Sequence, residues 1–173
     1  MLSRDTGASR DYGRNPYTGY DDPVTQPFLF DAEPDPRLPP KERVAALGGD
    51  ADPVPLTALT EAGVFELEVS GRPVIVWSVG GLRSALDSSR IDDGRTIGAT
   101  GAFDPVLDGR HLHFRREGAD RFVDAETGSI WTILGEAVAG PLAGSRLAPV
   151  DHVDTFWFAW AAFHPTTRIA RTP

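Results

Sequence analysis

The chain has 173 residues, no cysteine and a formal net charge of −8 at pH 7. The lack of cysteine excludes disulfides, thiolate nucleophiles, Cys-ligated zinc and iron–sulfur clusters. Nucleic-acid binding needs a basic face, so we expect no nucleic-acid partner. No apolar run of about 18 residues occurs, so no membrane span is predicted. The sequence opens without a charged segment followed by an apolar one, so no signal peptide is predicted.

Residues 1–40 are dense in Gly, Pro, Asp and Arg, and they follow neither a helical nor a strand period. Such polarity is typical of disorder, but the segment also carries several large apolar side chains. These are Tyr12, Tyr17, Tyr20, Phe28, Leu29 and Phe30. We therefore predict an ordered, extended arm over residues 1–40, with these side chains as anchors. The arm would lie across a single β-rich domain formed by residues 41–173.

Two short helices are predicted after the arm. Residues 41–48 follow two prolines and precede a glycine, which are typical start and stop signals. Residues 56–61 form the second predicted helix, with Gly63 as its stop signal.

A β-hairpin is predicted next. Residues 64–69 alternate, with Phe65 on one side and Glu66 on the other, and Ser70 and Gly71 form a tight turn. Residues 73–79 are almost continuously apolar, which is typical of a central strand covered on both faces.

Turn signals recur at intervals of roughly ten residues through the rest of the chain, a spacing typical of antiparallel β proteins. Strands are predicted at residues 97–103, 111–115, 121–123 and 130–134. The predicted fold class is therefore mainly β (α+β): an antiparallel, barrel-like sheet domain with short helices.

The last predicted element is an aromatic helix over residues 155–164, capped by Asp154 and followed by Pro165. Its large aromatic side chains recur at helical spacing and form one apolar stripe. They are Phe156, Trp157, Trp160 and Phe163. We expect this helix to pack on one face of the sheet.

The stretch DAETGSIWTILGEAVAGPLAG, at residues 124–144, is accompanied in order by GRPVIVW and DGRHLHF before it and FAWAAFHPTTR after it. In sequence and spacing these segments resemble the family of domain of unknown function 3179 (DUF-3179), over about residues 51–170. The opening LSRDTG segment resembles one that follows a first copy in longer members, so the chain is similar to the C-terminal half of a duplicated protein. The resemblance implies an uncharacterised function and points to an extracytoplasmic location.

This chain departs from fuller copies of that family at two places. They carry a His-Glu pair where this chain has Ala62 and Gly63, and a Cys-x-x-Cys motif at positions 79–82. Soft metal binding or redox chemistry would use such groups. The resemblance therefore implies a non-catalytic, degenerate domain without a cofactor. It would act as a structural or interaction module that pairs with a fuller copy or with itself.

Two histidines form the main alternative site. His111 and His113 are two residues apart, so a strand would place both on one face, about 7 Å apart. Two imidazoles bind zinc or copper if a third ligand joins them, and Asp124 or Glu126 in the following turn could supply it. The simpler interpretation is a solvated strand face that carries two separate histidines.

Glu136 is a further candidate because it lies close to Trp131 in the sequence. A half-buried carboxylate beside an aromatic ring can have a raised pKa and act as an acid or base. Alternatively, Glu136 binds an arginine or a turn and locks two strands together. One carboxylate without a partner does not make a catalytic site, so no catalytic residue is predicted. A third hypothesis is a small-ligand-binding β domain with a pocket beneath Gly80 and Gly81.

Overall fold

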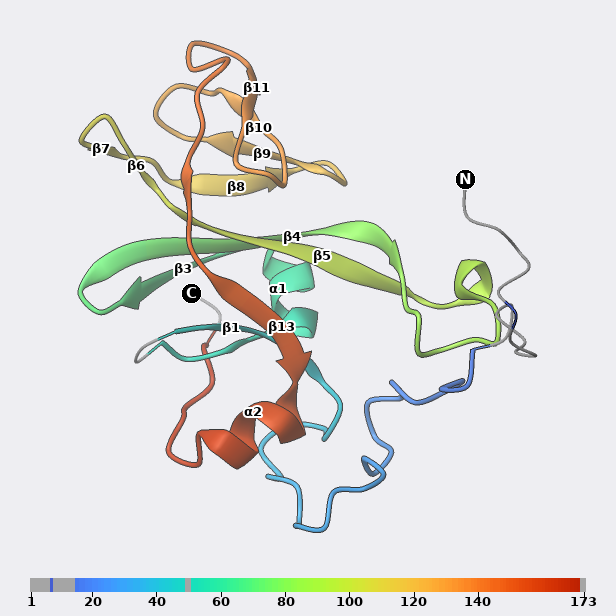
Figure 1. Ribbon diagram of the computed structural model, residues 1–173. Coiled ribbons are helices and arrows are strands. Elements are labelled where there is room, and N and C mark those ends of the chain that lie inside the picture. The colour runs from blue at the N-terminus through green and yellow to red at the C-terminus, as the bar shows by residue number, and fades with distance from the viewer. Residues whose placement is uncertain (1–6, 8–14, 49–50, 172–173) are drawn as a thin grey trace.

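The computed structural model describes residues 7, 15–48 and 51–171, and antiparallel strands dominate it (Figure 1). Within these ranges the strands form three sheets of three or four strands and one two-stranded hairpin, β6 (Val106–Leu107) with β7 (Arg110–His111). A 3-10 helix, η1 (Ile91–Asp93), lies in the connection between two consecutive strands of the central sheet. The mainly β prediction is confirmed, but none of these sheets closes into a barrel.

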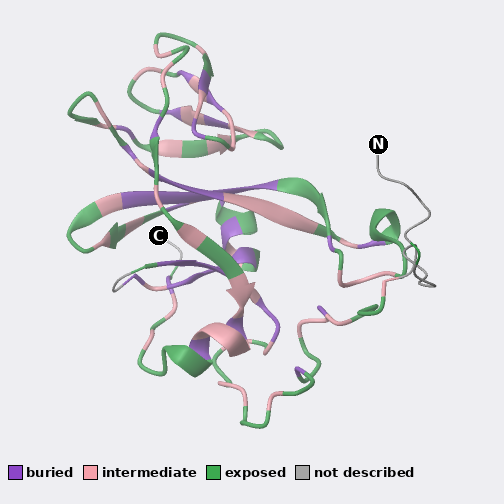
Figure 2. Ribbon diagram, viewed as in Figure 1, coloured by how far each residue is buried: buried purple, intermediate pink, exposed green. Residues whose placement is uncertain are grey.

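The central sheet has the order β12-β5-β4-β3. Its strands are β3 (Val64–Val69), β4 (Arg72–Arg83), β5 (Thr96–Asp104) and β12 (Ala148–Pro149). The predicted hairpin is confirmed, because β3 pairs with β4 in antiparallel register from Val64 opposite Trp77 to Val69 opposite Arg72. Strand β4 is buried from position 74 to 79 and covered on both faces (Figure 2).

One face of β4 supports an upper layer formed by the sheet β11-β10-β9-β8 (Figure 1). Its strands are β8 (Phe114–Glu117), β9 (Arg121–Asp124), β10 (Ile130–Trp131) and β11 (Ala137–Ala139). Trp77 stacks on Phe122 with ring centroids 4.2 Å apart, and its indole donates a 3.1 Å hydrogen bond to the Ile133 carbonyl. The layers meet closely at Gly101, where an added Cβ would lie 2.7 Å from that carbonyl oxygen.

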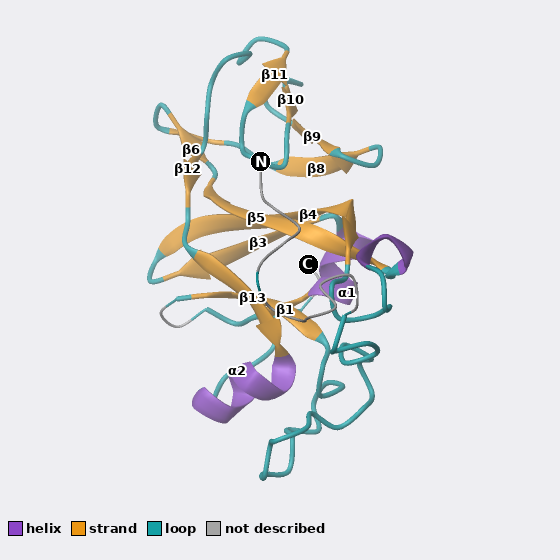
Figure 3. Cartoon of the chain, turned by 45° about the vertical axis from the view of Figure 1, so that its right-hand side comes forward, coloured by secondary structure: helices purple, strands orange, loops and turns teal. Residues whose placement is uncertain are grey.

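The other face of the central sheet is covered by helix α1 (Leu56–Ala62) and the lower sheet β13-β1-β2 (Figure 3). The strands of this sheet are β1 (Arg43–Leu47), β2 (Val54–Pro55) and β13 (His152–Phe156). The helix predicted at 56–61 is confirmed by α1, which Gly63 follows with a φ of 86°.

The helix predicted over residues 41–48 is wrong, because residues 43–47 form strand β1. This strand pairs with β2 on one side and with β13 on the other. Its last four residues are all buried, and pairing on both sides satisfies their backbone groups. Tertiary burial therefore outweighs the helix propensity of the two alanines.

The C-terminal helix, α2 (Trp157–Phe163), is shorter than predicted. Asp154 does not cap it, because this residue lies within strand β13 and no side chain caps the helix. Trp157 is fully buried against Val44, but Phe163 is 84% exposed, so the predicted stripe is only partly covered. No helix in the described part of the chain has the length and apolar character needed to cross a membrane.

Residues 15–40 form turns and extended segments that lie against the rest of the chain (Figure 1). Asn15, Gly19 and Asp21 hydrogen-bond backbone groups of residues 85–89 beyond the end of β4. Tyr20 packs edge-on against Phe28 and Phe156. Leu29 is 89% exposed and does not anchor the arm, and Tyr12 lies outside the described residues.

Candidate functional site

The two histidines of the sequence motif lie side by side at the end of the β6–β7 hairpin. The strand predicted over 111–115 is broken, because His111 ends β7 and His113 lies in the short link before β8. Leu112 between them is buried and donates its N–H to the Pro105 carbonyl, while the His113 carbonyl accepts the Ala125 N–H. This link leaves both imidazoles on one side, stacked with ring centroids 4.6 Å apart.

Glu66 of β3 brings a carboxylate to the same place. Its Oε1 lies 2.6 Å from His111 Nε2. Glu66, His111 and His113 each offer one ligand atom, and these atoms all lie within 4.8 Å of one another. Within the described ranges, this is the one group of three acidic or histidine side chains that meets in this way.

Glu126 orients His113 through contacts with its ring and its backbone. Its Oε1 lies 2.7 Å from His113 Nδ1, and its Oε2 accepts the His113 backbone N–H at 2.9 Å. The hydrogen bond to Glu126 raises the pKa of His113 above its ordinary value. Burial acts to raise the pKa of Glu126, but the hydrogen bonds from His113 outweigh it and lower that pKa. Because Nδ1 of His113 is hydrogen-bonded to Glu126, Nε2 is the ring nitrogen that remains free to coordinate a metal ion.

This arrangement has the parts of an open metal site. Two imidazoles and a carboxylate form a common ligand set for zinc, and a second carboxylate behind one imidazole fixes its tautomer and orientation. His111 Nε2 is buried, and its close contact with Glu66 is not aligned as a hydrogen bond, so this nitrogen lacks a hydrogen-bonding partner among the described residues. Ligand atoms around a tetrahedral zinc ion stand roughly 3.3 Å apart. Metal binding would therefore move Glu66 Oε1 and His111 Nε2 apart by less than an ångström.

Asp124, the other carboxylate proposed from the sequence as a third ligand, is not part of this group. It is buried, and its oxygens accept hydrogen bonds from the indole of Trp131, the hydroxyl and N–H of Thr127 and the N–H of Ser129. Burial acts to raise the pKa of Asp124, but these hydrogen bonds outweigh it and hold that pKa below the usual range. Asp124 and Trp131 thus tie the turn at residues 124–128 to strand β10.

Glu136 lies apart from the histidines, in the upper layer. Its Oε1 is 2.8 Å from Nη2 of Arg146, and the two residues form an isolated antiparallel bridge. The contact joins the segment before β11 to the segment before β12. The group that holds the histidines does not include Glu136.

A family model described as "Protein of unknown function (DUF3179)" matches residues 1–167. The chain belongs to the DUF3179 family. Searches among curated proteins and among solved structures gave no match. The DUF3179 match extends ahead of residue 51, and so includes the opening LSRDTG segment, whose resemblance to longer family members the sequence also indicated.

Glu66 is the residue of this DUF3179 domain that sequence reasoning missed. The alternation in β3 does place Glu66 opposite Phe65, and Val64 on the same face as Glu66 packs in the upper core. That face therefore points toward the layer that carries His111. The missing information was the long-range contact between β3 and the β6–β8 region, which no local pattern encodes.

Proposed function

We propose that this DUF3179 domain binds one divalent transition-metal ion through Glu66, His111 and His113. The observation that carries the proposal is the convergence of their ligand atoms within 4.8 Å. Imidazole and carboxylate ligands suit zinc and copper(II), whereas calcium and magnesium prefer sites built entirely from oxygen.

Three protein ligands leave at least one coordination position for water or for a group from another molecule. The side chains of the site are part-exposed, at 41% for Glu66, 34% for His111 and 61% for His113, which leaves room for that fourth ligand. Glu126 would keep Nδ1 of His113 protonated and direct Nε2 toward the ion.

The direct test is metal binding by the purified, tag-free chain. The protein is stripped with 1,10-phenanthroline, dialysed and titrated calorimetrically with zinc and with copper(II). We expect one equivalent to bind, and His111→Ala and Glu66→Gln each to weaken binding at least tenfold. His164→Ala is the matched control, because His164 is exposed beyond α2 and its ring stacks on Trp160. Failure of both metals to bind, or equal binding by His111→Ala, would overturn the proposal.

Association with a second copy of the family domain is a separate proposal. The exposed apolar side chains of Leu29 (89%) and Phe163 (84%) favour it, because a partner could cover them. Light scattering after size exclusion tests it, alone and with a fuller family copy. A strict monomer in both cases at high micromolar concentration would contradict this proposal.

A further inference from the structure

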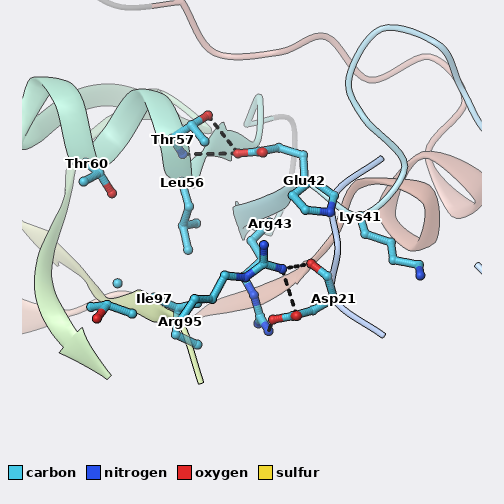
Figure 4. A pocket seen from close by; sticks show the side chains of 12 residues that line it. Asp21, Lys41, Glu42, Arg43, Leu56, Thr57, Thr60, Arg95 and Ile97 are labelled. Atoms are coloured by element: carbon cyan, nitrogen blue, oxygen red, sulfur yellow. Dashed lines mark hydrogen bonds and ion pairs between the residues drawn. The ribbon is translucent and has the colours of Figure 1, made fainter. Parts of the chain in front are cut away.

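A second site lies away from the histidines, where four segments of the chain surround a pocket of about 370 Å³ (Figure 4). The segments are the arm around Asp21, the start of β1, helix α1 and the start of β5. A volume of this size falls in the range of small-molecule sites, roughly 300–1,000 Å³. No residue of the proposed metal site lines it.

The pocket carries an excess of positive charge in an acidic protein. Its lining includes three cationic side chains, Lys41, Arg43 and Arg95, and two anionic ones, Asp21 and Glu42. Lys41 is already satisfied, because its Nζ donates to the Tyr20 carbonyl and to Thr25 Oγ1.

Arg95 differs from Lys41 because only one of its guanidinium nitrogens has a partner. Nη2 donates to the backbone carbonyl of Asp21 and lies 2.8 Å from Asp21 Oδ1. Nε and Nη1 of Arg95 have no hydrogen-bond acceptor within the described residues. The side chain is 38% exposed, and Figure 4 shows it reaching across the pocket toward Asp21.

Asp21 holds this guanidinium in place. The Asp21 side chain is completely buried. Its Oδ2 accepts a hydrogen bond from Ser84 and lies 3.4 Å from Nη2 of Arg43. Arg43 in turn lies over the Phe156 ring, 5.0 Å from its centroid. Arg95 is therefore positioned with donors to spare before any ligand arrives, which lowers the entropic cost of binding.

The remaining walls are suited to an apolar body. Leu56 and Ile97 line the pocket, and Thr60 stands on the exposed side of α1 at its edge. Glu42 is directed to the N–H and hydroxyl of Thr57. Its negative charge disfavours a doubly charged anion such as phosphate, whereas the single net positive charge of the lining matches a monoanion.

We propose that this pocket binds a small organic monocarboxylate. The unpaired Nε and Nη1 groups of Arg95 lie on different sides of the guanidinium, so one of them donates a single charge-assisted hydrogen bond to the ligand's carboxylate. The apolar body of the ligand packs on Leu56 and Ile97. This inference is independent of the proposed metal site.

The test is calorimetric titration of the metal-stripped chain with butyrate and benzoate, with butanol as the uncharged analogue and inorganic phosphate as the dianionic probe. We expect saturable binding of a carboxylate with a Kd of about 0.1–10 mM, as its few atoms allow. Butanol and phosphate should each bind at least tenfold more weakly. Removing a charged hydrogen-bond donor costs about 1.5–3 kcal/mol, so Arg95→Gln should weaken binding about 10- to 100-fold.

Two further variants keep the test decisive if Arg95→Gln loosens the arm. Thr60→Phe places a ring at the edge of the pocket without touching Asp21, and should abolish binding while the chain stays folded. Arg72→Gln removes an exposed arginine at the start of β4 and should leave binding unchanged. Equal binding of butanol, stronger binding of phosphate, unaltered binding by Thr60→Phe, or no carboxylate binding at about 20 mM would each overturn the proposal.

Discussion

The indole Nε1 of Trp131 donates a 2.8 Å hydrogen bond to Oδ2 of Asp124, and both side chains are buried. The same carboxylate accepts the backbone N–H groups of Thr127 and Ser129. One ionised group therefore organises a turn and connects it to the upper core.

Trp131→Phe should lower the free energy of unfolding by about 1–3 kcal/mol, because the buried carboxylate loses one of its donors. Urea denaturation followed by far-UV circular dichroism measures this loss. In a double-mutant cycle with Asp124→Asn, the two losses should not add, since both substitutions break the same contact. Full additivity would show that the indole acts only by filling space.

Acid should destabilise the protein as two buried carboxylates are protonated. Burial acts to raise the pKa values of Asp21 and Asp124, but hydrogen bonds outweigh burial and lower both pKa values. Ser84 and Arg95 donate to Asp21. Trp131 and Thr127 are the chief donors to Asp124. A lowered folded-state pKa adds stability that is present above the unfolded value of 3.8 and is lost as pH falls through the folded value. Denaturation midpoints measured from neutral pH to below 3 should show this decline. Asp124→Asn, although less stable at neutral pH, should lose less on acidification.

Local signals in the sequence were sufficient for much of the fold. The alternation in residues 64–69, the tight turn and the apolar run that follows predicted β3, β4 and their pairing correctly. The helix predicted over residues 41–48 depended on the prolines before it and the glycine after it, and RVAAL between them has no strand alternation to oppose that prediction. Its state is decided by β2 and β13, and β13 lies more than a hundred residues away in the chain.

Glu42 acts as a cap for helix α1 from outside the helix. Its Oε1 accepts hydrogen bonds from the N–H and the hydroxyl of Thr57, in the first turn. Glu42→Ala should therefore cost about 1 kcal/mol, as for loss of an N-cap. Thermal unfolding would measure the cost. Glu61→Ala, on the exposed surface of α1, is the control, and its free energy of unfolding should stay within about 0.5 kcal/mol of the parent value. A Glu42→Ala protein as stable as that control would contradict the capping role.

Metal affinity should depend on Glu126 and on pH. Glu126→Gln weakens the orienting contact to His113, so we expect zinc affinity to fall about 10- to 100-fold. Because the pKa of His113 is raised above 6.5, a proton competes for Nε2 at mildly acidic pH. Affinity should therefore rise as pH increases through 6.5 and level off only above the raised pKa of His113.

Zinc titrations of both proteins at several pH values would check this expectation. In Glu126→Gln the plateau should begin at lower pH, because the pKa of His113 returns toward its ordinary value. A pH-independent affinity in the parent protein would argue against coordination by His113.

The candidate site was only partly predictable. The spacing of His111 and His113 indicated a shared face, but the distance between their rings depends on the break in the strand at Leu112. Glu66 was absent from the predicted ligands because its approach depends on how the central sheet packs on the layer above it. Pairings between distant segments decide such contacts, and the residues concerned carry no local mark of them.

Strand β4 directs Val74 and Val76 into the lower core, and Ile75 and Trp77 into the upper one. Neither core can be completed before this strand is in place, and neither can lose it without exposing the other. The two layers should therefore not melt separately. Because β4 belongs to both cores, their stabilities are coupled. A cavity made in either core should therefore lower the free energy of the single cooperative unfolding transition of the whole β structure.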